Sequence, residues 1–387
     1  MALPISYNIR NVFVRWRSTL ATILGVGLVV AVYVLIQSLA AGLERSSANT
    51  GDPRNVLITR KGSTAESSSQ VTRDQVKVIQ FLPGVARNDA GEPLLSADVL
   101  VLISVPRVGG QGEANVNVRG MSPIGRELRP QVTLVAGRWF SSGKREVVVA
   151  QRLAARFANF NIGQTFKTAG QELTVVGWMD GGNTAFDSEV WMDVDQARAV
   201  FDRDYFSSVV VRSTDPGNTN LLTGRLEGDK RLPLRAERET DYYSNQTMTA
   251  TPIRFLGNFL ASAMSIGAVF AAMNTMYASV GARTREIGTL RVLGYRRRWI
   301  LVGFLLEGGL LALVGGMVGC LLALPMNGYA TGTLSFNTFS EVVFQFRITP
   351  QLAVKGLAFA FTVGVIGSFL PALRASRLPV IASLKSL

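Results

Sequence analysis

Four long apolar runs decide most of what this chain of 387 residues can fold into. An α-helix needs roughly 20 apolar residues to cross a hydrocarbon core of about 30 Å. The four runs are residues 20–41 and 255–280, which carry no charge, residues 299–326, which carry only Glu307, and residues 351–373, which carry only Lys355. The sequence therefore predicts an α-helical membrane protein with four transmembrane helices and a large domain between the first two.

The first run also resembles the apolar core of a secretory signal peptide, because basic residues precede it and Ser38-Leu39-Ala40 is similar to a cleavage site. Such a core is about 7 to 15 residues long, and this run is longer. We therefore expect a retained transmembrane helix.

The basic residues near the ends of the runs predict the orientation of the chain, since short loops rich in Lys and Arg stay in the cytoplasm. Three segments are rich in them: Arg10, Arg15 and Arg17; then Arg283, Arg285, Arg291, Arg296, Arg297 and Arg298; and finally Arg374, Arg377 and Lys385. The loop between the third and fourth runs carries only Glu341 and Arg347. We expect both termini in the cytoplasm and residues 43–252 outside.

The basic residues near the ends of the apolar runs also account for most of the net charge of +13. Residues 43–252 contain 25 Lys/Arg against 24 Asp/Glu, whereas the remainder of the chain contains 15 against 3. Because the excess follows the membrane topology, it does not indicate nucleic-acid binding.

Residue usage excludes several kinds of chemistry. The chain has no His, and its single Cys, Cys320, lies in the third run, which excludes His-based triads, disulfides and Cys zinc sites. Residues 137–145, GRWFSSGKR, resemble a P-loop, but five residues separate the glycines instead of four and Arg145 replaces the Ser/Thr. We interpret this segment as a turn, and predict no catalytic, cofactor or metal site in this chain.

The large domain is predicted to be mixed α/β and to form two subdomains. The expected strands are residues 55–59, 98–105, 115–119, 146–150, 173–178, 189–192 and 208–212. Helices are expected after the capping residues Thr72 and Asp193, and from Gln151. The expected core aromatics are Trp139, Phe140, Trp178 and Trp191.

Small residues recur every fourth position in three of the runs, which lets helix backbones approach closely in lipid. The stripes are Ala263, Gly267 and Ala271; Gly308, Ala312 and Gly316, with Gly315, Gly319 and Ala323 beside them; and Gly356, Ala360, Gly364 and Ser368. We predict that they pack against each other or against a second copy. Because Glu307 is the only ionisable residue deep in a run, a polar substrate route through the helices is not expected.

Residues 273–309, MNTMYASVGARTREIGTLRVLGYRRRWILVGFLLEGG, form the most distinctive stretch. Ile287, Leu290 and Leu293 recur every third residue and give one apolar face to a short helix that Gly294 can end. Arg and Glu on the other faces suit a helix that docks on a protein, although an interfacial helix held by anionic lipid has the same pattern. The stretch closely resembles the segment joining the second and third helices of MacB/FtsX-type ABC transporter permeases.

The resemblance extends along the chain. ALPISYNIRNVFVRWRSTLATILGVGLVVAVYVL is similar to the amphipathic helix and first span of the family, and GVIGSFLPALRASRLPVIASLKSL to its closing helix and tail. GRWF followed by REVVVAQRLA, and FDSEVWMD, resemble its periplasmic module. MacB itself carries an ATPase domain in the same chain, and we expect none here. The resemblance therefore implies a DevC/LolC-like permease that needs a partner ATPase.

The resemblance implies a non-catalytic permease subunit of an ABC transporter in the bacterial inner membrane. A partner ATPase dimer would bind ATP and Mg²⁺, while this chain binds no cofactor. Two permease copies, or two related permeases, would form a dimer in the lipid bilayer, with a periplasmic adaptor protein as a further expected partner. The implied function is mechanotransmission: ATP hydrolysis moves the periplasmic domain and drives export or extraction of a periplasmic or membrane-derived substrate. The alternatives are an FtsX-like signalling subunit that activates a periplasmic enzyme without transport, and a receptor without an ATPase.

The resemblance also implies site residues. The side chains expected to contact the ATPase are Arg283, Arg285, Glu286, Ile287, Leu290, Arg291 and Leu293. Glu307 lies eight residues beyond Trp299, about 12 Å along a helix at 1.5 Å per residue. It is predicted either to pair with an arginine of the loop or to reach the interface as a single carboxylate.

The predicted segments follow from these observations. They are an amphipathic helix (1–18), the first span (19–42), the periplasmic domain (43–252), the second span (253–280), the coupling loop (281–298), the third span (299–326), a short periplasmic loop (327–350), the fourth span (351–373) and a cytoplasmic tail (374–387).

Overall fold

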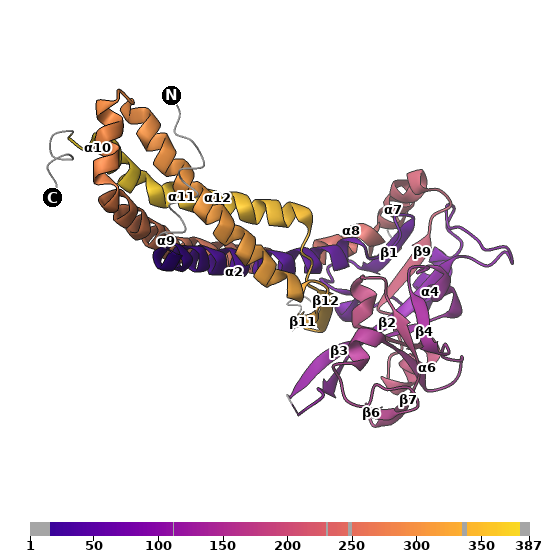
Figure 1. The fold of residues 1–387 in the computed structure, drawn as a ribbon. Helices are drawn as coiled ribbons and strands as arrows, with labels where there is room; N and C mark the ends of the chain where they lie inside the picture. Colours follow the sequence, from indigo (N-terminus) through magenta and orange to yellow (C-terminus); the bar gives the residue numbers. More distant parts are fainter. Residues whose placement is uncertain (1–15, 111, 230, 247–249, 335–338, 380–387) are drawn as a thin grey trace. The chain divides into compact units, whose positions relative to one another are not determined.

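The computed structural model describes residues 16–110, 112–229, 231–246, 250–334 and 339–379 (Figure 1). The predicted amphipathic helix at 1–18 and the tail at 374–387 lie largely outside the described residues. The chain divides into two compact units. The helix unit comprises Met1–Ala41, Pro252–Tyr329 and Phe346–Leu387, and the sheet unit comprises Gly42–Thr251 and Ala330–Gln345.

Four long helices confirm the predicted membrane-protein fold. They are α2 (Trp16–Ala48), α9 (Ala250–Ala282), α11 (Arg297–Ala323) and α12 (Pro350–Arg377). Each contains a stretch long and apolar enough to cross a membrane. The start of α12 is fixed locally, because Thr349 Oγ1 accepts a hydrogen bond from Leu352 N at 3.2 Å and Pro350 occupies the first turn.

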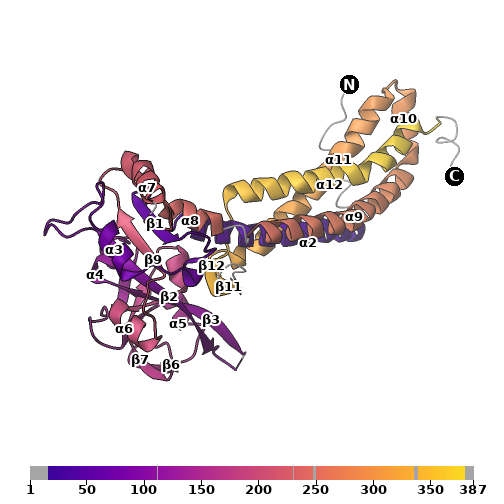
Figure 2. The same ribbon diagram turned by 180° about the vertical axis from the view of Figure 1, so that it is seen from behind.

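Helices α2 and α9 lie side by side in both views (Figures 1 and 2), and two polar pairs join them. Thr22 Oγ1 lies 2.6 Å from Thr275 Oγ1, and Gln37 Nε2 donates to Asn258 Oδ1 at 2.6 Å. Such pairs hold helices together in lipid, where no water competes for the polar groups. Polar side chains therefore take part in the contact between the two helices at two positions along their length.

The sheet unit is built on one ten-stranded sheet in the order β10-β1-β9-β2-β3-β8-β5-β7-β4, with β6 paired to β7. Only the β3/β8 and β5/β7 pairs are parallel. The strands are β1 (Asn55–Arg60), β2 (Leu95–Pro106), β3 (Glu113–Met121), β4 (Thr133–Gly137), β5 (Glu146–Ala150), β6 (Thr165–Thr168), β7 (Gln171–Asp180), β8 (Glu189–Asp193), β9 (Ser208–Arg212) and β10 (Leu234–Arg238). All seven strands predicted from the sequence are present.

Two hydrophobic clusters cover this sheet. Along β1, Val56 and Ile58 belong to the smaller cluster and Leu57 to the larger one, as the two-residue period of a strand requires. Strand β9 alternates in the same way, with Val210 in the larger cluster. The two clusters therefore lie on opposite faces of β1 and β9, and the division of this unit into two subdomains stays a prediction.

Short helices connect the strands. They are η1 (Glu66–Ser68), α3 (Arg73–Ile79), α4 (Pro123–Glu127), α5 (Gln151–Ala154), η2 (Ala185–Ser188), α6 (Val194–Val200), η3 (Pro216–Asn218), α7 (Thr219–Gly228) and α8 (Glu239–Asn245). The predicted capping residues act as expected: Thr72 Oγ1 accepts from Gln75 N, and an oxygen of the Asp193 carboxylate accepts from Gln196 N.

The segment between α11 and α12 differs from the short loop predicted at residues 327–350. After η5 (Leu324–Met326), strands β11 (Ala330–Leu334) and β12 (Glu341–Gln345) form an antiparallel hairpin. This hairpin belongs to the sheet unit, not to the helices that flank it. The sequence did not predict it because its contacts are with residues more than 150 positions away.

Candidate functional site

The loop between α9 and α11 contains the short helix α10 (Thr284–Val292). Its end has the geometry of a Schellman motif: Tyr295 N donates to Leu290 O at 3.1 Å and Gly294 N to Arg291 O at 3.2 Å. Gly294 has a φ of +92°, which a residue with a side chain rarely adopts. The glycine therefore ends α10 where the sequence predicts and turns the chain toward α11.

The three apolar residues of α10 do not share one face, which corrects part of the predicted contact surface. Ile287 is buried in a cluster with Ile300 and Phe304, Leu290 is half-buried, and Leu293 is 70% exposed. Residues three apart drift about 60° around an α-helix, so two steps carry the stripe roughly 120° from the inside to the outside. Ile287 is thus a core residue and not available to a partner.

The remaining predicted contact residues also divide into two groups. Arg285 and Glu286 are exposed, whereas Arg283 and Arg291 are half-buried. Val292, which the sequence analysis did not single out, is 61% exposed beside Leu293. Two adjacent, exposed, branched apolar side chains at the end of a helix are a signal that only the burial pattern of α10 reveals.

Arg283 and Glu307 form an ion pair that joins the loop to α11. Arg283 Nη1 lies 2.9 Å from Glu307 Oε2 and 3.2 Å from Oε1, and both side chains are nearly buried. The guanidinium also lies over the ring of Phe304 at 5.3 Å and reaches Glu286 Oε2 at 3.3 Å. Of the two alternatives for Glu307, the structure therefore places it against an arginine of the loop.

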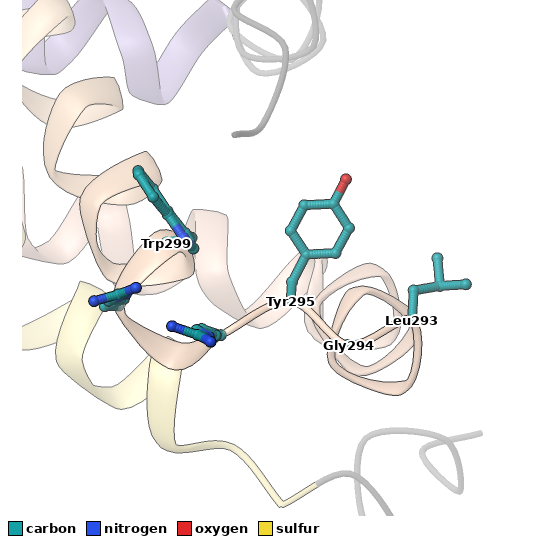
Figure 3. Close-up of a pocket in the computed structure, with 6 residues that line it drawn as sticks. Leu293, Gly294, Tyr295 and Trp299 are labelled. Carbon is teal, nitrogen blue, oxygen red and sulfur yellow. The ribbon is translucent and has the colours of Figure 1, made fainter. Parts of the chain in front are cut away.

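A shallow pocket of about 310 Å³ opens between α10 and the first turn of α11 (Figure 3). Figure 3 shows the ring of Tyr295 between Leu293 and Trp299. The pocket is lined by Leu293, Gly294, Tyr295, Arg296, Arg298 and Trp299. It therefore combines aromatic and aliphatic walls with two exposed guanidinium groups, a combination found at protein–protein contact sites.

The small residues of α11 and α12 pack against each other. A Cβ added at Gly308 would lie 1.6 Å from Ser368 Oγ, and one added at Gly364 would lie 2.3 Å from the Cβ of Ala312. Gly316 faces Ala360 in the same way, and Gly356 faces Val34 of α2. These backbones approach too closely for larger side chains, as the small-residue pattern predicts.

The predicted stripe on α9 has no packing partner among the residues that the structure describes. Ala263 and Ala271 are exposed, and no atom of the described residues lies within 4 Å of a Cβ added at Gly267. Instead, Ala268 and Ala272 are buried, roughly 110° around the helix from the predicted stripe at about 100° per residue. The stripe on α9 therefore does not pack against another helix among the described residues, and its packing against a second copy stays a prediction.

A cluster of charged side chains in the sheet unit is buried and has no access to solvent. Arg119 donates to Glu66 Oε2 at 2.8 Å and to Glu189 Oε1 at 2.7 Å, and Arg129 donates to Asp98 Oδ2 at 2.7 Å. Glu66 is desolvated, yet the charge and hydrogen bonds of Arg119 lower its pKa. These groups bind each other and leave no open face for a substrate, so this cluster is structural.

The aromatic residues of the sheet unit are also structural. Trp191 is fully buried and stacks on Trp139 at 6.1 Å, and Phe140 is buried. Trp178 Nε1 donates to Phe160 O at 2.9 Å.

The GRWFSSGKR segment is a turn after β4, closed by the two hydrogen bonds of Arg138 to Glu146 at 2.7 and 2.6 Å. Among the described residues, no group of three or more Cys, Asp or Glu side chains has a geometry that could hold a metal ion.

Comparison with known proteins finds a family match in each half of the chain. Residues 18–228 match the family model of the MacB-like periplasmic core domain, and residues 258–380 match that of the FtsX-like permease C-terminal domain. The uncharacterized ABC transporter permease YknZ of Bacillus subtilis is 24% identical over 95% of this chain and 93% of its own length. The macrolide export ATP-binding/permease protein MacB of Hahella chejuensis is 24% identical over 85% of this chain.

The chain spans about half of that MacB relative, 55% of its length. Among solved structures, the extracellular domain of YknZ from Gram-positive bacteria aligns with a TM-score of 0.37 and 14% identity, covering 48% of this chain and 100% of that domain. Four apolar helices, a mixed α/β domain between the first two and the two family matches agree with one another. The chain therefore belongs to the MacB/FtsX-type ABC transporter permeases.

Proposed function

We propose that this permease subunit couples ATP hydrolysis by a separate ATPase dimer to movement of its sheet unit. In this proposal α10 and the pocket beside it face the cytoplasm and dock on the ATPase, and the sheet unit lies in the periplasm. ATP and Mg²⁺ bind to the partner chain, and this chain supplies no catalytic group. The movement drives export or extraction of a periplasmic or membrane-derived substrate.

The observation that carries the proposal is the exposed surface at the end of α10. Val292 and Leu293 are exposed next to a pocket that contains Arg296 and Arg298. Contiguous exposed apolar side chains mark interaction sites on folded proteins, and the neighbouring arginines favour an acidic partner surface. We name this surface, formed by Glu286, Val292, Leu293, Arg296 and Arg298, the docking surface.

The Arg283–Glu307 pair gives the docking surface a mechanical connection. Arg283 ends α9 and leads into α10, while Glu307 lies more than two turns inside α11. A displacement of α10 by a partner would therefore act on α9 through the chain and on α11 through the ion pair. Glu307 is the only charged residue deep in the four apolar runs, which supports a role in transmitting motion over a role as a polar conduit.

The charge distribution supports the proposed orientation. The helix unit contains 15 Lys/Arg against 2 Asp/Glu. Twelve of these basic residues lie in three segments: residues 10–17 around the start of α2, residues 283–298 between α9 and the first turn of α11, and residues 374–385 from the last turn of α12 onward. Short basic loops stay in the cytoplasm, so the proposal assigns these three segments to the cytoplasmic side. The proposal also includes a second permease copy or a related permease, because an ATPase dimer has two docking positions.

The experiment that tests the proposal is co-purification of the full chain with a P-loop ATPase subunit in mild detergent. The wild-type chain is expected to retain the subunit, and the double variant Val292→Ser, Leu293→Ser to lose it at least tenfold. Leu221→Ser is the matched control, because Leu221 is also exposed, at 59%, but lies on α7 of the sheet unit. A preparation that lacks an ATPase, or a double variant that retains it fully, would overturn the proposal.

A further inference from the structure

The β11–β12 hairpin is attached to the sheet unit by a buried carboxylate. Glu341, at the start of β12, is 1% exposed. Its Oε2 accepts from Arg107 Nη2 at 2.5 Å, and its Oε1 accepts from Arg156 Nε at 2.8 Å and lies 2.6 Å from Arg156 Nη2. Arg107 follows β2 and Arg156 follows α5, so one carboxylate joins three segments that are remote in sequence.

The hairpin is also bound through its backbone and its apolar side chains. Val343 N donates to Ser188 Oγ at 2.7 Å, and Val343 itself is fully buried in the larger core of the sheet unit. Asn117 Nδ2 on β3 donates to Ser340 Oγ at 3.2 Å. Since Ser188 lies in the FDSEVWMD segment next to Glu189, the hairpin reaches the residues that surround Arg119.

Two glycines allow this close attachment. A Cβ at Gly332 of β11 would lie 2.3 Å from Glu341 Oε1, inside the ion-pair cluster. A Cβ at Gly42, where α2 enters the sheet unit, would lie 2.0 Å from Gln345 O of β12. The hairpin is therefore in backbone contact with the end of α2 as well as with the sheet.

Such an attachment exceeds what a connection between two helices requires. Loops that only connect elements lie on the surface and keep their polar groups in water. A buried ion pair adds little net stability compared with apolar residues of the same size, and its best-supported use is to fix one geometry. The buried Glu341 therefore indicates that the position of the hairpin on the sheet unit matters.

We propose that the β11–β12 hairpin is a force-bearing latch, through which displacement of α11 and α12 moves the sheet unit directly. Glu341 is its positioning residue. The chain passes from α11 through the latch into α12, so the sheet unit has a second mechanical attachment besides the ends of α2 and α9. This inference rests on the proposed function, since the latch transmits motion that an ATPase supplies.

The test uses the full chain assembled with its ATPase in lipid nanodiscs, in a Cys320→Ser background. Spin labels at Ile162→Cys in the sheet unit and Leu324→Cys at the end of α11 report their distance by pulsed electron paramagnetic resonance. The wild-type latch is expected to give a change in distance between the nucleotide-free and ATP-bound states. Glu341→Gln is expected to lose at least half of that change while ATP hydrolysis stays within twofold of wild type.

A covalent rescue distinguishes transmission of motion by the latch from a purely structural role of Glu341. In the Glu341→Gln background, Asn117→Cys with Ser340→Cys, oxidised to a disulfide, is expected to restore substrate transport or ATP-dependent proteolytic protection of the sheet unit, and reduction to remove it again. Arg107→Gln, which removes the more exposed of the two cations, is expected to give an intermediate loss and serves if Glu341→Gln fails to fold.

The outcomes separate the two proposals. A wild-type distance change that persists in full in Glu341→Gln and in Arg107→Gln overturns the latch and leaves the proposed function intact. A wild-type chain with no nucleotide-dependent change overturns the proposed function and the latch with it. Loss of the change in both variants, with rescue by the disulfide, supports the latch.

Discussion

Arg119 in the sheet unit and Arg283 in the helix unit are both ion-paired, but their surroundings differ. Arg119 is buried among Glu66, Asp98 and Glu189, with distances of 2.7 to 3.2 Å. Arg283 pairs with the buried Glu307 and with the exposed Glu286. The first arrangement joins η1, β2, β3 and β8 of the sheet unit, and the second joins the loop between α9 and α11 to α11.

The difference indicates how the two regions function. A buried network in which each charge has several partners rigidifies its surroundings. The Arg283–Glu307 pair lies beside exposed residues, so the loop can follow a partner that binds there. We infer that the sheet unit moves as one body and that the loop between α9 and α11 is the part that responds to the ATPase.

The largest expected effect comes from Arg119→Met, which leaves the buried carboxylates of Glu66 and Glu189 without their cation and Asp98 with Arg129 alone. Removal of one partner from a buried pair costs about 3–5 kcal/mol, so we expect the sheet unit to unfold at a much lower denaturant concentration. The measurement is urea unfolding of the full chain in detergent, followed by tryptophan fluorescence.

Arg138→Met is the matched control for that variant. Arg138 also binds a carboxylate through two hydrogen bonds, but its side chain is 53% exposed. Exposed pairs contribute little, so this variant is expected to unfold near the wild-type midpoint. Equal midpoints for the two variants would contradict the distinction drawn between the buried and exposed arginines.

A smaller effect is expected for Arg283→Met, which leaves Glu307 without its cation. Hydrogen bonds to charged groups contribute about 1.5–3 kcal/mol, so amide hydrogen exchange in α10 should become roughly ten- to a hundredfold faster. Exchange in the sheet unit should not change. The double variant Arg283→Met, Glu307→Met is expected to recover part of the protection, because no buried charge then lacks its partner. Wild-type exchange in Arg283→Met would contradict the role of the pair.

The smallest effect concerns pH. Burial raises the pKa of Glu239 above its ordinary 4.5, against the opposing attraction of Arg129 and the hydrogen bond from Asn55. The folded chain therefore binds this proton more tightly than the unfolded chain. The contribution of Glu239 to stability is greatest below pH 4.5 and falls as the pH rises from 4.5 through the raised pKa.

Glu239→Gln should remove that fall and flatten the profile of melting temperature against pH above 4.5. One pKa unit corresponds to about 1.4 kcal/mol, so the change is modest compared with Arg119→Met. Glu66→Gln is the opposite control, because the lowered pKa of Glu66 contributes stability that is lost as the pH falls below 4.5. A steeper profile in Glu239→Gln would show that its carboxylate is charged and stabilising.

Local signals predicted much of the fold. Strands β1, β5 and β9 are short runs of branched residues, and Thr72, Asp193 and Gly294 mark helix ends through contacts within a few residues. These features depend on neighbours in the sequence, so a single sequence reveals them. The four long helices follow from length and hydropathy in the same way.

The features that were missed depend on distant partners. The hairpin at β11 and β12 is held by Arg107 and Arg156, which lie 234 and 185 residues from Glu341. Ile287 was predicted to share one apolar face with Leu290 and Leu293. A three-residue period drifts around the helix, and this drift puts Ile287 on the buried side of α10. The Arg283–Glu307 pair was expected as one of two alternatives, and only the positions of α9 and α11 distinguish them.

The most direct test of the central claim places a photo-crosslinking benzophenone amino acid at Leu293 in the full chain in native membranes. We expect a crosslink to a P-loop ATPase subunit, identified by mass spectrometry, and none from the same probe at Phe270, an equally apolar position that is exposed on α9. Crosslinks from Leu293 to lipid alone, or an ATPase crosslink from Phe270 and not from Leu293, would contradict it.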